Sequence, residues 1–114
     1  MDGLELARVA CQAAQEKKGI DVLALDMRDF LAIVDYFVIT SGNSTVHVQA
    51  LAQEIEERLA AQGVKPARRS GVAGARWILL DYGSVVVHVF HEDERDYYNL
   101  ERYWQAAPRL ELSK

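Results

Sequence analysis

Apolar and polar positions along this 114-residue chain follow a helical period in two segments. The first segment runs from Leu4 to Lys18, and Gly19 ends it because glycine readily adopts the left-handed conformation of a helix cap. The second begins at Asn43 or Ser44, whose short side chains can cap free backbone N–H groups, and Gly63 ends it. Its predicted buried stripe consists of Val48, Leu51, Ala52, Ile55 and Leu59.

Short apolar segments between and after these helices predict strands. Residues 20 to 27 carry aliphatic side chains at both alternating sets of positions, which is typical of a strand covered on both faces. Residues 36 to 41 are rich in β-branched and aromatic side chains, and a short strand is predicted over 65 to 70. With a hairpin over 76 to 90, the pattern predicts a single mixed sheet of about five strands in an α/β fold, with helices packed mainly on one face.

The hairpin sequence "RWILLDYGSVVVHVF" fixes a strand register if Gly83 and Ser84 form a two-residue turn. Cross-strand partners then follow by counting outward from the turn, and side chains alternate between the two faces of the sheet. One face carries aliphatic residues and one tyrosine, and we expect helices to cover it: Ile78, Leu80, Tyr82, Val85, Val87 and Val89.

The opposite face of the hairpin has a mixed character. Its predicted pairs are Trp77 with Phe90, Leu79 with His88, and Asp81 with Val86. Apolar anchors beside an acid and an imidazole are typical of a surface that binds a partner protein. A further helix covering this face would instead make Trp77 and Phe90 part of the core, with His88 and Asp81 as a polar pair. Both interpretations remain open at this point.

The charge of the chain restricts its partners. With 13 basic and 17 acidic residues the net charge is −4, which disfavours a protein that binds DNA by neutralising phosphates and favours a basic protein partner. Four basic residues lie between positions 64 and 76, so contact with RNA through this segment is a secondary expectation. No segment is long and apolar enough for a membrane helix, and the N-terminus lacks a signal-peptide pattern. We expect a cytoplasmic protein.

The length of the chain favours one domain over residues 1–114, with a short irregular tail over 105–114. Catalytic motifs are lacking: no serine lies in a nucleophile elbow, and His88 and His91 are spaced for opposite faces of a strand, so we expect no metal, cofactor or enzymatic activity. The segment "TSGNST" precedes a helix and could bind an anion, which leaves a nucleotide-binding or residual nucleotidyltransferase domain using Ser41 to Ser44 as the alternative. Such transferases need two metal-binding acids at alternate strand positions, and Asp81 supplies one.

Two long stretches of the sequence resemble the ribosomal silencing factor family, also called Iojap-like proteins. They are "DYFVITSGNSTVHVQALAQEIEERL" and "RWILLDYGSVVVHVFHEDERDYYNLERYW", and the resemblance extends from the first helix through Trp104. It implies a nucleotidyltransferase-like fold without the catalytic acids, and binding to the large ribosomal subunit through its fourteenth ribosomal protein. Bound there, such a protein blocks joining of the small subunit and represses translation when nutrients are short. A role in large-subunit biogenesis is also implied.

Together the hairpin pattern and the resemblance predict a partner-binding surface. From the sheet face it comprises Trp77, Leu79, Asp81, His88 and Phe90, and from the closing segment Tyr98, Glu101 and Trp104. Exposed aromatic side chains of this kind can also pair with a second copy, so we expect a homodimer when the protein is free.

Overall fold

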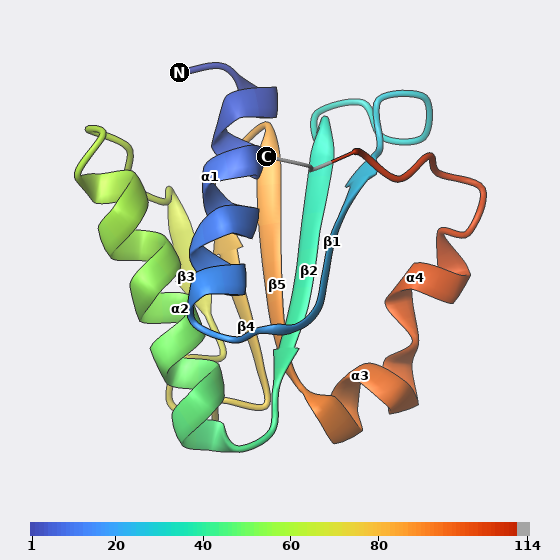
Figure 1. Ribbon diagram of the computed structural model, residues 1–114. Helices are drawn as coiled ribbons and strands as arrows, with labels where there is room; N and C mark the ends of the chain where they lie inside the picture. Colours follow the sequence, from blue (N-terminus) through green and yellow to red (C-terminus); the bar gives the residue numbers. More distant parts are fainter. Residues whose placement is uncertain (112–114) are drawn as a thin grey trace.

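The computed structural model describes residues 1–111 and contains one mixed five-stranded sheet. Its strands are β1 (Ile20–Asp26), β2 (Tyr36–Gly42), β3 (Arg68–Ser70), β4 (Trp77–Asp81) and β5 (Val85–His91). They lie in the order β1-β2-β5-β4-β3; β2 and β5 are parallel, and the other neighbours are antiparallel (Figure 1). The predicted mixed sheet is therefore confirmed. The predicted strand over 65 to 70 begins only at Arg68, since Pro66 has no N–H to donate to a sheet.

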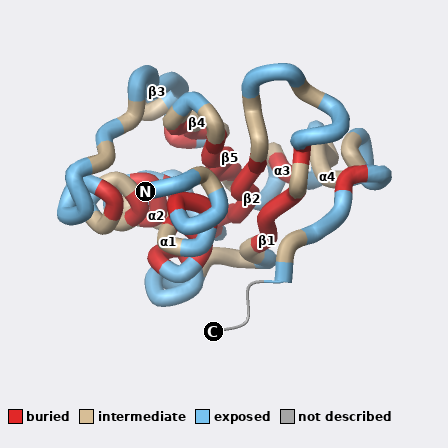
Figure 2. Tube along the Cα trace, turned by 90° about the horizontal axis from the view of Figure 1, so that it is seen from above, coloured by how far each residue is buried: buried red, intermediate tan, exposed pale blue. Residues whose placement is uncertain are grey.

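Two long helices cover one face of this sheet and two short ones cover part of the other. α1 (Gly3–Glu16) and α2 (Thr45–Ala60) lie on the first face, as predicted, whereas α3 (Glu92–Tyr98) and α4 (Leu100–Tyr103) lie on the second (Figure 2). The Ser44 side chain caps α2 by accepting a hydrogen bond from the His47 N–H at 3.1 Å. All five residues of the predicted stripe of α2 are buried.

The hairpin has the predicted turn and register. The Tyr82 N–H donates to the Val85 carbonyl at 2.8 Å, and Gly83 takes a left-handed φ of 88° between them. Trp77 lies opposite Phe90, Leu79 opposite His88 and Asp81 opposite Val86. Because the turn determines the register, the assignment of every hairpin side chain to its face follows from two residues of sequence.

Each face of the sheet has its own apolar cluster. The first lies beneath α1 and α2 and includes Val38, Leu51, Ile55 and Val87, all fully buried. It also holds Cys11, and burial raises the pKa of that thiol to about 12. The second cluster lies beneath α3 and α4 and contains Leu23, Leu25, Met27, Phe37, Ile39, Val86, Phe90 and Ala107. The sheet is therefore covered on both faces, which explains the apolar residues at both alternating sets of positions in β1.

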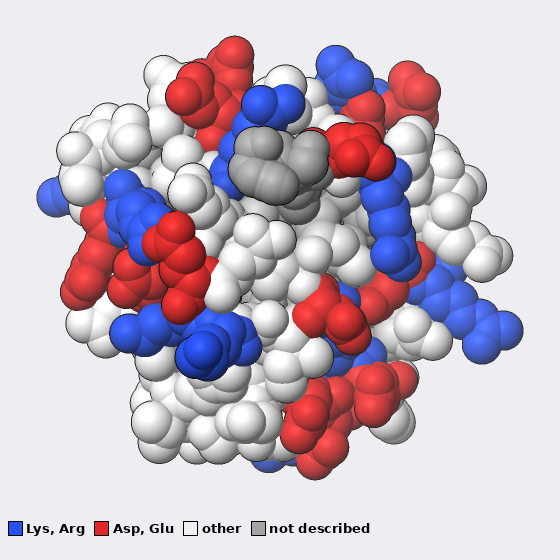
Figure 3. All heavy atoms as spheres, viewed as in Figure 1, with Lys and Arg blue, Asp and Glu red and all other residues white. Residues whose placement is uncertain are grey.

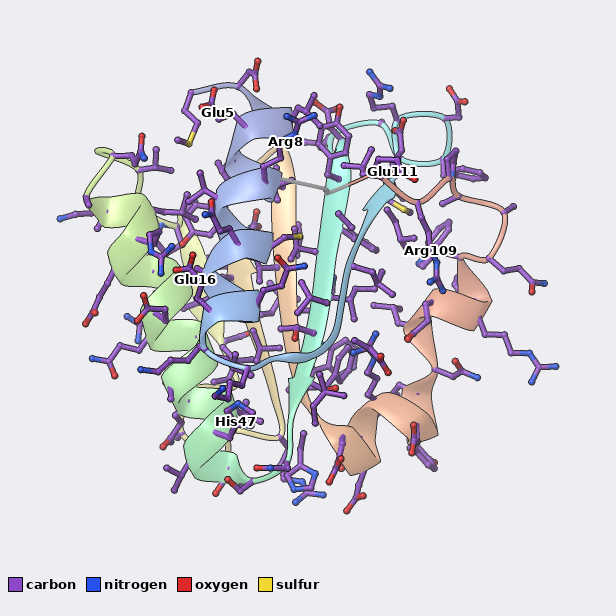
Figure 4. The ribbon with its side chains drawn as sticks, in the orientation of Figure 1. Glu5, Arg8, Glu16, His47, Arg109 and Glu111 are labelled. Atoms are coloured by element: carbon purple, nitrogen blue, oxygen red, sulfur yellow. The ribbon has the colours of Figure 1, made fainter. Side chains whose placement is uncertain are left out.

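The chain after α4 runs back along the outer edge of β1. The Asp26 N–H donates to the Pro108 carbonyl at 2.8 Å, the Leu110 N–H donates to the Ala24 carbonyl at 2.9 Å, and Leu25 and Arg109 form a β-bridge. Arg109 lies beside β1 in Figure 4. The predicted irregular tail therefore pairs with the sheet over 108–110, and positions 112–114 lie outside the described residues.

Gly71 is required where the chain turns from β3 to β4. It has a left-handed φ of 76°, and a Cβ atom there would lie 2.0 Å from the Trp77 carbonyl oxygen. We expect Gly71→Ala to lower the thermal unfolding midpoint by more than Gly63→Ala, because Gly63 has a similar φ of 80° but open space around it. Circular dichroism melting of both variants measures the difference, and equal shifts would show that the close contact carries no cost.

Candidate partner-binding surface

Aromatic rings form a continuous row across the second face of the sheet. Neighbouring rings lie 4.7 to 6.3 Å apart between centroids, within the range of favourable edge-to-face and offset contacts. In order, the row comprises Phe30, Trp104, Phe37, His88, Trp77, Tyr98 and Tyr97. It connects the loop before β2 with α4, crosses the sheet from β2 to β4, and ends on α3. We call this set the aromatic row.

The two ends of the aromatic row are exposed and its middle is buried. At one end Tyr97 is 80% exposed and Tyr98 is 50% exposed. At the other end Phe30 is 41% exposed, and Tyr103, which packs on Trp104, is 77% exposed. Trp77 and Trp104 are partly exposed. The surface that can reach another molecule therefore lies at two places, one around Trp77 on the hairpin and one around Trp104 on α4.

His88 and Phe90 do not lie on the surface, contrary to the prediction that they belong to an exposed face. Phe90 is fully buried and His88 is 5% exposed, because α3 and α4 fold back over β5. The interpretation that a further helix covers this face is correct for these two residues. The predicted polar pair is wrong, however, since the Trp77 Nε1–H donates to the His88 Nδ1 at 3.2 Å and Asp81 lies elsewhere.

The hydrogen bond from Trp77 determines the state of the His88 imidazole. Because Nδ1 accepts, the neutral ring carries its proton on Nε2, and this nitrogen is buried without a partner among the described residues. Burial lowers the pKa of His88 from 6.5 to about 4, since a charged imidazole would lose its hydration there. At neutral pH the ring is uncharged and holds the Trp77 indole against Phe90, at 4.7 Å between centroids.

Asp81 and Leu79 lie on the hairpin beside Trp77 and are partly exposed. The Asp81 carboxylate accepts from the Gly83 N–H at 2.8 Å and faces the Arg68 guanidinium at 3.8 Å. Next to them a shallow hollow of about 270 Å³ is lined by Ser70, Gly71, Trp77 and Leu79. This part of the predicted surface is therefore brought together as expected, and it includes an apolar recess.

Glu101, predicted to bind a partner, is instead engaged inside the molecule. Its Oε2 accepts a hydrogen bond from the Arg95 Nε at 2.9 Å, and its other carboxylate oxygen is buried without a partner among the described residues. Arg95 is itself only 6% exposed and also donates to three acceptors in β1 and β2: the Ile20 carbonyl at 2.9 Å, the Asp21 carbonyl at 2.8 Å and the Ser41 hydroxyl at 3.1 Å. The pair fastens α3 and α4 to the sheet.

Acidic side chains gather on α3 beside the Trp77 end of the aromatic row. Figure 3 shows them at the lower right, over α3. Glu92 and Asp93 are exposed in its first turn, and Asp96 is exposed one turn later. Glu94 pairs with Arg76 at 2.7 Å. Exposed aromatic rings next to exposed acids suit a basic partner, because charge guides encounter and aromatic contact supplies affinity.

The turn from Ser41 to Ser44 uses its polar groups internally. The Ser41 side chain is 1% exposed and bonds Arg95, and the Asn43 N–H donates to the His47 Nδ1 at 3.1 Å. The other ring nitrogen of His47 lies 3.1 Å from the Lys17 carbonyl; Figure 4 places His47 in the first turn of α2. These contacts leave the turn with few groups for a nucleotide phosphate.

Residues 1–111 offer neither a metal site nor a membrane-spanning helix. No group of three or more histidine, cysteine or acidic side chains is arranged there to hold a metal ion. None of the helices described is long and apolar enough to cross a membrane.

Known proteins similar to this chain carry the names of ribosomal silencing factors and of Iojap proteins. The whole chain, residues 1–114, matches the family model described as "Ribosomal silencing factor during starvation". Proteins named ribosomal silencing factor RsfS from Bacillus subtilis and Halalkalibacterium halodurans are 45% and 47% identical over 98% of this chain and 95% and 96% of their own lengths. A chloroplast protein of Zea mays named Iojap is 31% identical over 96% of this chain and 47% of its own length.

Two solved structures are similar to this fold. A crystal structure from Bacillus halodurans has a TM-score of 0.84 and 45% identity, covering 96% of this chain and 100% of its own. An X-ray structure of a protein from Chromobacterium violaceum has a TM-score of 0.88 and 32% identity, covering 92% and 88%. The α/β fold is shared over nearly the whole length.

The burial of His88 predicts a pH dependence of stability. The pKa is about 4 in the folded protein and 6.5 in the unfolded chain, so the unfolded chain binds one more proton between these values. The stability that the uncharged, buried His88 contributes is complete above pH 6.5 and is lost as the pH falls toward 4. Over this range the free energy of unfolding decreases by up to about 1.4 kcal/mol per pH unit. The variant His88→Asn keeps an acceptor near Trp77 but cannot titrate. We expect its free energy of unfolding to decrease less steeply between pH 7 and pH 5 than that of the unaltered protein.

Urea unfolding at pH 7, 6 and 5, followed by tryptophan fluorescence, measures this difference between the two proteins. An equally steep decline in His88→Asn would assign the pH dependence to other groups. The urea dependence of the unfolding free energy serves as the control, since a changed slope would indicate an altered folded or unfolded state.

Proposed function

Since this chain belongs to the ribosomal silencing factor family, a regulatory family and not one of enzymes, we propose that it binds the large ribosomal subunit and prevents the small subunit from joining. The contact is made through the fourteenth ribosomal protein of the large subunit. Translation is repressed in this way when nutrients are limited, and the protein also has a role in large-subunit biogenesis. Acting on ribosomes in this way, the protein works in the cytoplasm.

The observation that carries this proposal is the partly exposed Trp77 beside the acids of α3. Trp77 is held by the hydrogen bond to His88 and by its contacts with Phe90 and Tyr98, so little side-chain entropy is lost when a partner packs on it. Leu79 and Asp81 flank it on β4. We therefore assign the first contact with the ribosomal protein to Trp77, Leu79, Asp81 and Tyr98, and a second contact to Trp104 at the other end of the aromatic row.

The proposed mechanism is steric and needs no chemistry. A folded domain fixed at the intersubunit face occupies space that the small subunit requires. Its effect depends on how long it stays bound, since related complexes differ mainly in dissociation rate. His88, Phe90 and Glu101 contribute by holding the surface in place from inside the molecule.

Two other functions have less support. Nucleotide binding at Ser41 to Ser44 would compete with the internal hydrogen bonds of Ser41 and Asn43. Direct RNA binding would use the four basic side chains between positions 64 and 76, and two of these are already paired: Arg69 with Glu56 at 3.2 Å and Arg76 with Glu94 at 2.7 Å. Any contact of this segment with ribosomal RNA is therefore secondary to the protein contact.

Co-sedimentation with isolated ribosomal subunits tests the proposal. We expect the protein to sediment with large subunits alone and to reduce the amount of joined particle formed when small subunits are added. Trp77→Ala should weaken binding by about 2 kcal/mol or more, as expected for a central aromatic anchor. Val46→Ala is the matched control, because Val46 is a 73% exposed apolar residue on α2, on the other face of the sheet.

Both variants must first show the thermal unfolding of a folded protein, since Trp77 packs on Phe90. Tyr98→Ala, a more exposed change, replaces Trp77→Ala if that variant unfolds. Equal binding of the folded variants would move the contact away from the hairpin, and failure of the unaltered protein to bind large subunits would reject the function.

We also propose that the free protein forms a homodimer through the exposed ends of the aromatic row. Tyr97 and Tyr103 are 80% and 77% exposed, and each packs against a neighbouring ring of the row, so that each end presents an aromatic patch on which a second copy can pack. We expect analytical ultracentrifugation to show a concentration-dependent dimer that Tyr97→Ser with Tyr103→Ser weakens. A monomer at all concentrations up to the millimolar range would reject this dimer.

A further inference from the structure

Within residues 1–111, one edge of the sheet is covered by another segment of the chain, and the other edge is open. The outer edge of β1 is covered by residues 108–110, which donate and accept backbone hydrogen bonds along it. β3 is the last strand on the opposite side and pairs only with β4 among the described strands. All three of its residues are exposed. An uncovered edge presents backbone N–H and C=O groups to which another extended chain can pair.

Side chains next to β3 give its outer edge a positive charge beside an apolar recess. Arg68 lies opposite Asp81 and Ser70 lies opposite Leu79, so both are on the second face of the sheet, beside the hollow. The Arg68 side chain is 80% exposed, and its contact with the Asp81 carboxylate is loose at 3.8 Å. A chain lying along β3 would therefore meet a cation at one position and, two residues further on, an apolar recess.

A second copy of this chain is a poor occupant of the edge. Antiparallel pairing of two β3 strands about their middle would place Arg69 opposite its own copy and bring both Arg68 side chains near. Like charges directly opposite each other across a strand pair are destabilising. The arginines thus disfavour self-association in this register while leaving the edge open to a chain of the opposite charge.

We propose that the outer edge of β3 binds an extended acidic segment of another protein, which adds to the sheet as a sixth strand. An acidic side chain of that segment lies opposite Arg68, and an apolar side chain two residues away enters the hollow lined by Ser70, Gly71, Trp77 and Leu79. Main-chain hydrogen bonds supply affinity, and the two side chains determine which segment binds. The inference does not rest on ribosome binding.

Amide hydrogen exchange of the full chain, read by NMR, tests this binding at residue resolution. The probe is a six-residue β-prone peptide with glutamate and leucine two positions apart. The first control peptide carries lysine in place of glutamate, and the second has proline between the two side chains, which removes a main-chain donor. We expect the glutamate peptide to slow exchange at 68–70, the lysine peptide to bind roughly fivefold more weakly, and the proline peptide not to bind.

Arg68→Glu provides the decisive comparison, because it should reverse the preference between the glutamate and lysine peptides. Arg68→Thr, a β-prone replacement without charge, should abolish the preference and serves if the first variant is poorly folded. No slowing at 68–70, or equal binding of both peptides to all three proteins, would overturn the proposal. Protection of these amides that rises with protein concentration alone would also overturn it, in favour of a second copy.

Discussion

The buried ion pair between Arg95 and Glu101 is the interaction on which the second face of the sheet depends. One guanidinium reaches two carbonyls at the start of β1 and the Ser41 hydroxyl at the end of β2, and it holds a carboxylate from α4. Removing one partner of such a pair leaves an unpaired buried charge, at a cost of about 3–5 kcal/mol. Short helices such as α3 and α4 have little stability of their own, so this anchor determines where they lie.

The position of these helices determines which side chains are exposed to a binding partner. Because α3 and α4 cover β5, His88 and Phe90 are buried and pack beneath the surface residues, while the ends of the aromatic row stay exposed. Asn99 makes this possible with a left-handed φ of 51°, which separates α3 from α4 and turns the chain. A surface of this kind is presented by a rigid base, which favours recognition without rearrangement.

Much of the fold is predictable from the sequence because its signals are local. Helical periods define α1 and α2, and the Gly83–Ser84 turn fixes the register of β4 and β5 without any long-range information. The docking of the closing segment is not predictable in this way, since α3 and α4 are too short to have a readable period. Arg95 stands among acids and is typical in sequence of a solvated helix face, yet its partners lie in β1, β2 and α4. The arrangement of the candidate surface was therefore only half predictable: the shared face of Trp77, Leu79 and Asp81 follows from the register, whereas the burial of His88 and the internal contacts of Glu101 depend on tertiary structure.

The pairing of residues 108–110 with β1 also has a consequence for biosynthesis. Leu25 and Arg109 are joined in one bridge although most of the chain lies between them, so β1 leaves the synthesising ribosome long before the segment that covers its edge. Until that segment arrives, an apolar strand with an open edge, backed by an uncovered sheet face, is available to neighbouring nascent chains. The nascent chain is most vulnerable to misassembly in this interval, and completion of the domain depends on closing its longest loop last.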